Sequence, residues 1–327
     1  MPLAQLRSFD DLLVCPRCKE PLDRSARGNL RCTSQTCSIG NAEFPGVEGC
    51  DLLVDFQRSV VDREALLESS GESVIERRPW KELLQRVVDG GNRFAPHFAE
   101  DIVARLEQCE THTPTLLVIG GGQIGSGSQA LYSSQKVRII ALDVYLSPHV
   151  NIIGDAHHLP LRDESIDAVW IQSVLEHVTK PEAVVAELHR VLRSDGLVFA
   201  DTSFLWPVCE EAFDFQRFSA SAHRWLFRNF ELIAAGSSSG PGTVAAVALR
   251  YLLQSLLRST RLGQIAAFPF SALRLLDRFC DNRRAIDGAG GTFLYARKTG
   301  QSFTESHLVD YYAEQPRFQA KSRPLRR

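Results

Sequence analysis

Residues 115–127 read Thr-Leu-Leu-Val-Ile-Gly-Gly-Gly-Gln-Ile-Gly-Ser-Gly. The first five residues are apolar or β-branched and run directly into glycine, which is typical of a fully buried strand in a parallel sheet. At Gly120 and Gly122 the backbone lacks side chains and can approach a ligand, and we expect a sharp turn into a helix whose first amides face polar ligand atoms. By itself such a loop is also typical of dinucleotide-binding proteins, so the sequence after the loop is needed to identify the ligand.

Two further short apolar runs end in aspartates. The run 137–143 ends at Asp143, about twenty residues after the glycines, where a carboxylate can accept hydrogen bonds from both ribose hydroxyls and would repel a 2′-phosphate. The run 151–155 ends at Asp155. Three strand ends with ligand-binding character in this order predict a nucleotide-type site at the carboxyl edge of a parallel sheet.

These stretches resemble class I S-adenosylmethionine-dependent methyltransferases, particularly the branch similar to quinone-biosynthesis enzymes. The resemblance is carried by Gly154-Asp155-Ala156, by Leu159-Pro160-Leu161 and by Ser165-Ile166-Asp167-Ala168-Val169. It implies that Asp155 accepts a hydrogen bond from the adenine amino group and that Ala156 contributes backbone contacts. It also implies an α/β fold, a doubly wound Rossmann-like sheet of seven strands with the last antiparallel, binding S-adenosylmethionine at the carboxyl ends.

The resemblance continues through a strand over 166–172 into residues 173–178, which are similar to the family's segment beneath the methionine end of the cofactor. A helix with apolar residues on one face, ending at Asp195-Gly196, and a strand over 197–201 are expected next. Val118 stands where the family often has an acidic residue. The expected cofactor-binding residues are Gly120, Gly122, Gly125, Asp143, Asp155, Ala156 and Gln172.

Four of the eight cysteines lie near the N-terminus, as Cys15, Cys18, Cys32 and Cys37. Two thiol pairs of this kind can hold a structural Zn²⁺ tetrahedrally, and the segment has too few apolar residues to fold alone without such a centre. Residues 9–57 resemble the zinc-ribbon proteins that partner tRNA and translation-factor methyltransferases, in which the ribbon is a scaffold and interaction element. The resemblance implies a structural zinc ribbon and a possible protein partner bound through it.

Candidates for contacting the methyl acceptor follow the strand over 197–201. His177 is a candidate general base, because it follows the strand over 166–172 near the expected methyl group. Asp214 and Arg217, three residues apart, are either a structural ion pair or a catalytic pair, with Asp214 as the catalytic candidate. A related bacterial subgroup is expected to have histidine at the position of Cys209.

About fifty residues separate the expected strands at 230–233 and 292–297, and they contain apolar helical stretches over 244–257 and 265–279. One interpretation is a helical lid that completes the core. The other is an interfacial surface for a lipid-linked acceptor. Neither stretch is long and uncharged enough to span a membrane.

The expected organisation is a zinc ribbon (1–57), a helical connector or cap (58–110), the methyltransferase domain (111–300, with the insertion at about 242–282) and a C-terminal tail (301–327). In the connector, leucine and valine pairs at 66–67, 83–84 and 87–88 recur at helical spacings, and Trp80 and Phe94 either line a pocket or anchor the packing. The basic residues 321–327 are expected to be a solvated tail.

A net charge of −2 provides no overall positive field for nucleic acid. The N-terminus lacks a signal-peptide pattern, so a cytoplasmic location is expected. The predicted function is methyl transfer to an O, N or C nucleophile on a small-molecule, lipid-linked or glycan-type acceptor. Two alternatives stay open: an RNA methyltransferase whose ribbon grips RNA, and a non-catalytic protein that binds the cofactor or a partner.

Overall fold

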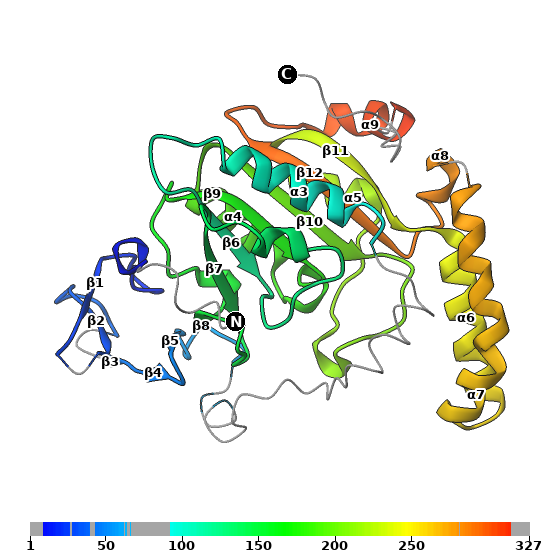
Figure 1. Cartoon of the computed structure of the whole chain (residues 1–327), viewed down its shortest axis with the longest axis horizontal. Helices are drawn as coiled ribbons and strands as arrows, with labels where there is room; N and C mark the ends of the chain where they lie inside the picture. Colours follow the sequence, from blue (N-terminus) through cyan, green and yellow to red (C-terminus); the bar gives the residue numbers. More distant parts are fainter. Residues whose placement is uncertain are drawn as a thin grey trace.

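The structure, a computed structural model, describes residues 9–26, 28–39, 43–61, 63, 66, 92–280 and 282–314. Within these residues a nine-stranded sheet runs in the order β11-β12-β10-β9-β6-β7-β8-β5-β4, beside a three-stranded sheet β1-β2-β3 (Figure 1). The large sheet consists of β4 (Gly46–Val47), β5 (Cys50–Leu53), β6 (Thr115–Ile119), β7 (Arg138–Asp143), β8 (Ile152–Gly154), β9 (Ile166–Gln172), β10 (Leu192–Ser203), β11 (Phe230–Ser239) and β12 (Gly291–Lys298).

The seven strands from β8 to β11 in this order confirm the predicted doubly wound sheet. Strands β8, β7, β6, β9 and β10 pair in parallel, and β12 is antiparallel to both β10 and β11. Consequently β11 points the same way as β10, and the carboxyl ends of six strands lie at one edge.

Strand β6 is buried on both faces, as its continuous apolar run predicts. Leu117 and Ile119 pack in one core cluster with helix α4 (Pro181–Val191), whereas Leu116 and Val118 pack in another with helix α3 (Ala95–Leu106). Side chains alternate between the two sides because successive residues of a strand point to opposite faces. Two cores, one on each face, therefore hold the central strand.

Aromatic rings fill the α3 face of the sheet. The rings of Trp170 and Phe199 stack with centroids 4.0 Å apart, and the Phe98 ring of α3 lies 4.8 Å from that of Tyr295. Phe94 is buried and its ring lies 5.1 Å from that of Phe293. Phe94 is thus a packing anchor, which was one of the two interpretations from the sequence.

The segment after the glycines does not form the expected α-helix. Residues 120–128 are turns and bends, followed by the short 3₁₀ helix η3 (Gln129–Tyr132). Gly127 has a φ of +86°, and a Cβ there would lie 2.7 Å from Cδ of Pro96 at the start of α3. The closely spaced glycines disfavour a helix, and α3 and η3 together cover this face.

The cysteine-rich segment is built into the large sheet, which therefore has two strands more than the seven predicted. Strand β5 pairs in parallel with β8, the edge strand of the predicted sheet, and β4 pairs with β5. The Val14 N–H donates to the Pro160 carbonyl at 3.0 Å, and Nζ of Lys19 lies 2.9 Å from Oε2 of Glu187 in α4. An exposed sheet edge is thereby covered by a segment of the same chain. The small sheet consists of β1 (Leu22–Arg24), β2 (Leu30–Cys32) and β3 (Glu43–Phe44), preceded by η2 (Asp10–Leu12).

The insertion is helical, as predicted, and the start of the predicted C-terminal tail is also helical. Phe303 holds the start of this tail against the domain. The Arg224 guanidinium lies over the Phe303 ring, with its Cζ 4.1 Å from the ring centroid, and the Phe303 N–H donates to the Arg228 carbonyl. The helices are α5 (Ala220–Leu226), α6 (Pro241–Leu256), α7 (Thr260–Ala267), η7 (Phe268–Arg278), α8 (Asn282–Ala285), η8 (Glu305–His307) and α9 (Leu308–Glu314).

Several sequence predictions lie outside the described residues. They are the connector positions Leu67, Trp80, Leu83, Leu84, Val87 and Val88, and the basic residues 321–327. The four-part division of the chain stays a prediction.

The Phe98 ring tests the α3 core. Replacing Phe98 with alanine removes a fully buried ring and should lower the free energy of unfolding by about 3–5 kcal/mol, measured by urea denaturation. The matched control is Phe268→Ala, which truncates an exposed ring and should change the free energy by about 0.5 kcal/mol or less. Equal losses in both variants would contradict the packing described here.

Candidate active site

The glycine loop lies at the carboxyl end of β6, where two glycines make contacts that exclude side chains. Gly120 has a φ of +74°, and a Cβ there would lie 2.4 Å from Cγ2 of Val174. A Cβ on Gly122 would lie 2.7 Å from Oδ2 of Asp143. Gly120 therefore favours glycine for its backbone conformation, and a side chain at Gly122 would displace the Asp143 carboxylate.

Asp143 ends β7 beside this loop. Its Oδ2 accepts a hydrogen bond from the Gly122 N–H at 2.7 Å, and its Oδ1 accepts one from the Val144 N–H at 2.7 Å. Burial raises the pKa of this carboxyl, and the backbone donors oppose that rise. The structure thus brings together the predicted loop and the predicted ribose-binding carboxylate.

Gln172 connects the end of β9 to the same loop. Its Nε2 donates to the Ser126 carbonyl at 3.2 Å, and its Oε1 accepts from Nε1 of Trp170 at 3.2 Å. A Cβ on Gly125 would lie 2.5 Å from that Oε1 atom. Gly125 and Gln172 are therefore direct neighbours, although 46 residues separate Gln172 from Ser126.

Asp155 follows β8 and is buried, with both carboxylate oxygens engaged within the chain. Oδ1 accepts from the His157 N–H at 2.9 Å and contacts its Nδ1 at 2.6 Å, and Oδ2 accepts from the Ser59 hydroxyl. Burial alone would raise the pKa of Asp155, but these partners outweigh it and lower that pKa. Ala156 begins the 3₁₀ helix η4 (Ala156–His158) and is also buried. Ser59, from the segment after the ribbon, is a neighbour that the sequence did not reveal.

His177 belongs to η5 (Leu175–His177), just beyond the end of β9. Its Nδ1 lies 2.8 Å from the Phe213 carbonyl and must donate to it, so in the neutral ring the Nε2 lone pair is available. That Nε2 lies 3.7 Å from Sγ of Cys209. Burial raises the pKa of the Cys209 thiol to about 12, so this neighbour is a neutral thiol at physiological pH.

Asp214 lies in the same loop, just after η6 (Glu211–Phe213), and its carboxylate is fully engaged. Arg217 forms a bidentate ion pair with it, and the Cys209 N–H donates to its Oδ2 at 2.7 Å. The hydrogen bonds from Arg217 hold the pKa of Asp214 below its usual range. This geometry matches the structural ion pair that the three-residue spacing left open.

Two acidic residues in this region are not among the site residues expected from the sequence. Glu176 is fully buried, and its carboxylate accepts from the hydroxyls of Thr202 and Ser203 at 2.9 and 2.7 Å. Asp201 is buried near the end of β10 and accepts from Nδ2 of Asn92 at 2.6 Å. Burial raises the pKa of Asp201 to about 7. An acidic residue ending an apolar strand, the signal that identified Asp143, also applies to Asp201.

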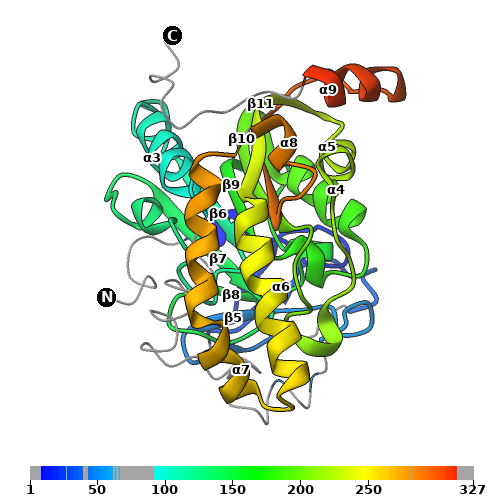
Figure 2. The ribbon, with the colours of Figure 1, turned by 90° about the vertical axis from the view of Figure 1, so that its right-hand side faces the viewer.

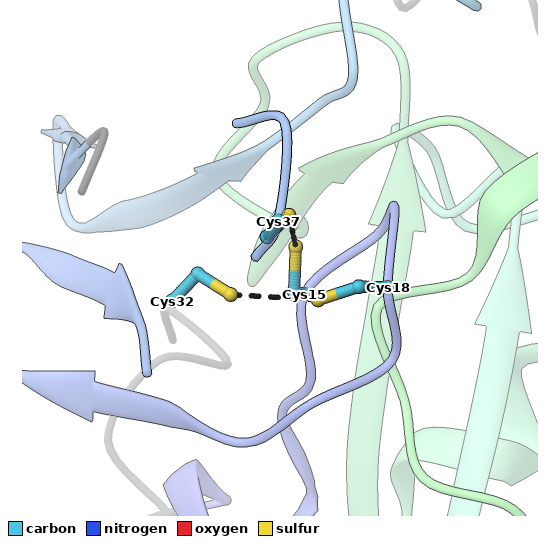
Figure 3. Close-up of side chains that lie close together, drawn as sticks. All are labelled: Cys15, Cys18, Cys32 and Cys37. Atoms are coloured by element: carbon cyan, nitrogen blue, oxygen red, sulfur yellow. Dashed lines mark hydrogen bonds between the residues drawn. The ribbon is translucent and has the colours of Figure 1, made fainter. Parts of the chain in front are cut away.

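The cysteine cluster is compact. The sulfur atoms of Cys15, Cys18, Cys32 and Cys37 all lie within 4.8 Å of one another, and Figure 3 shows them meeting at a common centre. The Sγ atoms of Cys15 and Cys37 are 3.9 Å apart, and those of Cys18 and Cys32 are 3.5 Å apart. Four sulfurs around a tetrahedral Zn²⁺ would be roughly 3.8 Å apart, given the usual Zn–S length, so the set fits this ion.

Comparison with known proteins identifies the fold around this site. Residues 123–200, from the end of the glycine loop through most of β10, match the family model described as "Methyltransferase domain". The chain carries a methyltransferase domain. This confirms the resemblance drawn from the sequence, and the matched region contains Asp143, Asp155, Gln172 and His177.

Curated relatives of the methyltransferase domain are similar over part of their length. The chain is 24% identical over 153 residues to a malonyl-[acyl-carrier protein] O-methyltransferase of Gallionella capsiferriformans, covering 40% of this chain and 53% of the relative. It is 33% identical over 136 residues to a demethylmenaquinone methyltransferase of Renibacterium salmoninarum, covering 38% and 54%. The chain thus spans about half the length of these two relatives, and only 17% of another malonyl-[acyl-carrier protein] O-methyltransferase, from Laribacter hongkongensis.

Among solved structures, a SAM dependent methyltransferase from Archaeoglobus fulgidus superposes with a TM-score of 0.41 at 13% identity. The superposition covers 67% of this chain and all of that one.

The Asp201 carboxyl should make stability depend on pH. Its folded pKa of about 7 lies above the unfolded value, so its favourable contribution is complete below about pH 4 and is lost as pH rises through 7. The neutral variant Asp201→Asn should therefore melt several degrees above the wild type at pH 8, and the gap should shrink toward pH 5. Calorimetry measures both, with exposed Asp310→Asn as the control. The same gap at both pH values would contradict the assignment.

Proposed function

We propose that this protein transfers a methyl group from S-adenosylmethionine to an O, N or C nucleophile on a small-molecule, lipid-linked or glycan-type acceptor. The observation that carries the proposal is the alignment of Gly120, Gly122, Asp143 and Gln172 along the carboxyl edge of a sheet with a matched methyltransferase domain. The relatives' names, which include a malonyl-[acyl-carrier protein] O-methyltransferase and a demethylmenaquinone methyltransferase, support a non-nucleic-acid acceptor.

The side-chain-free backbone at Gly120 and Gly122 forms a cradle that a cofactor can approach, and Asp143 beside it would accept the ribose hydroxyls. Asp155 would receive the adenine amino group by sharing or exchanging its bond with Ser59. When bound, S-adenosylmethionine supplies an electrophilic methyl carbon, to which the acceptor's nucleophile bonds as the carbon–sulfur bond breaks and S-adenosylhomocysteine leaves. The chain's task is alignment, which no metal has to assist.

We propose that His177 takes the acceptor's proton at Nε2. Its Nδ1–H bond to the Phe213 carbonyl fixes the ring and makes Nε2 the accepting nitrogen, where the acceptor's proton would replace that of the Cys209 thiol. Asp214, through Arg217 and the Cys209 N–H, then acts as a positioning residue for the loop that carries the Phe213 carbonyl. His177→Asn should lower kcat by about 10²-fold or more with unchanged cofactor affinity. A change confined to KM would assign His177 to acceptor binding alone.

Cofactor binding is tested by calorimetry. Asp143→Ala should abolish S-adenosylmethionine binding because it removes the acceptor for the ribose hydroxyls, whereas exposed Asp310→Ala should bind like the wild type. Unchanged affinity in Asp143→Ala would disprove the assigned cofactor site.

The acceptor is tested with methyl-labelled S-adenosylmethionine and cell extract separated into lipid, small-metabolite, glycan, protein and RNA fractions. Label in the lipid, small-metabolite or glycan fraction supports the proposal. Label in RNA, with binding that weakens with salt, would favour the RNA alternative. Cofactor binding without label in any fraction would favour the non-catalytic alternative.

We also propose that the four clustered cysteines hold one structural Zn²⁺ and that the ribbon's partner is the methyltransferase domain of its own chain. Elemental analysis should find one zinc per chain, and Cys32→Ser should lose the metal and lower the melting temperature, because β4 and β5 belong to the main sheet. The control is Cys280→Ser, which lies outside the cluster and should retain the metal. A Cys32→Ser protein with full zinc content would refute the ligand set.

A further inference from the structure

The insertion between β11 and β12 is a helical hairpin that stands away from the sheet. Helix α6 begins at Pro241, two residues after β11 ends, and packs side by side with η7, as the two views in Figures 1 and 2 show. Because β11 points the same way as β10, the hairpin leaves the sheet at the edge that carries the candidate active site. The buried apolar residues of the hairpin, Ala246, Val247 and Ala267, belong to none of the core clusters around the sheet, so the insertion does not complete the core as the helical-lid interpretation expected.

The hairpin is closed tightly at both ends. At its tip a Cβ on Gly263 would lie 2.5 Å from Cα of Gln254, so the two arms touch backbone to backbone. At its base the buried Asp277 carboxylate accepts from the Gly242 N–H at 2.6 Å and the Thr243 hydroxyl at 2.6 Å. The hairpin is thus an ordered element with a defined outer surface.

That outer surface is apolar, the reverse of a helix whose solvent side is polar. Leu256, Ile265 and Phe279 are 68%, 71% and 79% exposed. On α6 the exposed positions from 245 to 256 carry no charged side chain. The exposed large apolar residues of the hairpin and the turn after it are Tyr251, Leu252, Leu256, Leu257, Leu262, Ile265, Phe268, Phe270, Leu275, Leu276 and Phe279. An exposed apolar surface of this extent marks an interaction site.

The charged residues of this segment are mostly cationic. Residues 241–285 contain no lysine or glutamate, and their only acidic residues are Asp277, which is buried, and Asp281. Their cationic residues are Arg250, Arg258, Arg261, Arg274, Arg278, Arg283 and Arg284. Two copies meeting through this face would bring like charges together, whereas an anionic lipid surface complements both the arginines and the apolar side chains.

We infer that the hairpin is a docking surface for an anionic phospholipid bilayer, with its apolar side chains inserted at the interface and its arginines among the headgroups. Among the described residues there is no helix long and apolar enough to cross a membrane. The loop over 204–217, which carries the Phe213 carbonyl, is tied to the end of the insertion, since the Phe204 and Leu205 N–H groups donate to Gly290 and Ala289. Docking would place the bilayer next to this loop and to the methyl acceptor that the proposed function puts beside it. This consequence rests on the proposed function.

Vesicle co-sedimentation tests the inference with the full-length protein. The wild type should bind vesicles in which about one lipid in three is phosphatidylglycerol and the rest is phosphatidylcholine. It should bind vesicles of pure phosphatidylcholine more weakly, because each arginine near an anionic surface raises the binding constant about fivefold. The triple variant Leu256→Ser, Ile265→Ser, Phe279→Ser should lose more than about tenfold in partitioning. Arg258→Gln with Arg261→Gln should lose about twenty-five-fold, on anionic vesicles only.

The control variant is Val309→Ser, which removes an exposed apolar side chain of α9 outside the hairpin and should bind vesicles like the wild type. Circular dichroism and calorimetric S-adenosylmethionine binding verify that each variant is folded, so loss of vesicle binding with retained cofactor binding supports this inference alone. Equal sedimentation of the wild type and the triple variant would overturn it. So would a stable dimer in light scattering that the triple variant abolishes without vesicles present.

Discussion

The parallel pairing of β6 with β7 and β9 is the constraint on which the rest of the molecule depends. Because β6 is buried on both faces, its four apolar residues and the β-branched Thr115 fix its place at the centre of the sheet. Parallel strands bring their carboxyl ends to one edge, and that edge gathers Gly122, Asp143 and Gln172 from three separate strand ends. The site thus follows from strand direction, and the side chains there are supported by a rigid sheet.

Hydrogen bonds within the chain hold the acidic side chains at this edge in place. The Gly122 N–H holds Asp143, the Ser59 hydroxyl holds Asp155, and the hydroxyls of Thr202 and Ser203 hold Glu176. A buried carboxylate is expensive unless it is hydrogen-bonded, so these contacts offset the cost of placing several acidic residues together. For Asp201 the hydrogen bonds do not offset the cost of burial, which raises its pKa to about 7.

The two ends of the sheet carry additions of opposite character. At the β8 edge the cysteine-rich segment adds β5 and β4, covers an unpaired strand and buries its apolar side chains. Beyond β11 the hairpin from Pro241 to Arg278 leaves large apolar side chains in solvent. The cysteine-rich segment completes the sheet. The hairpin provides an apolar surface with arginines, at the sheet edge that carries the candidate active site.

The sequence by itself determined the parallel sheet, the cysteine cluster and the carboxylates at the ends of β7 and β8, because strand periodicity, glycine placement and cysteine spacing are local properties of the chain. Only the tertiary structure decided what these groups contact: Ser59 at Asp155, the Phe213 carbonyl at His177, and β5 along β8. Such partners lie up to about a hundred residues apart in sequence. Apolar helical stretches look alike whether they are buried or exposed, so only packing could show that the hairpin's outer face lies in solvent.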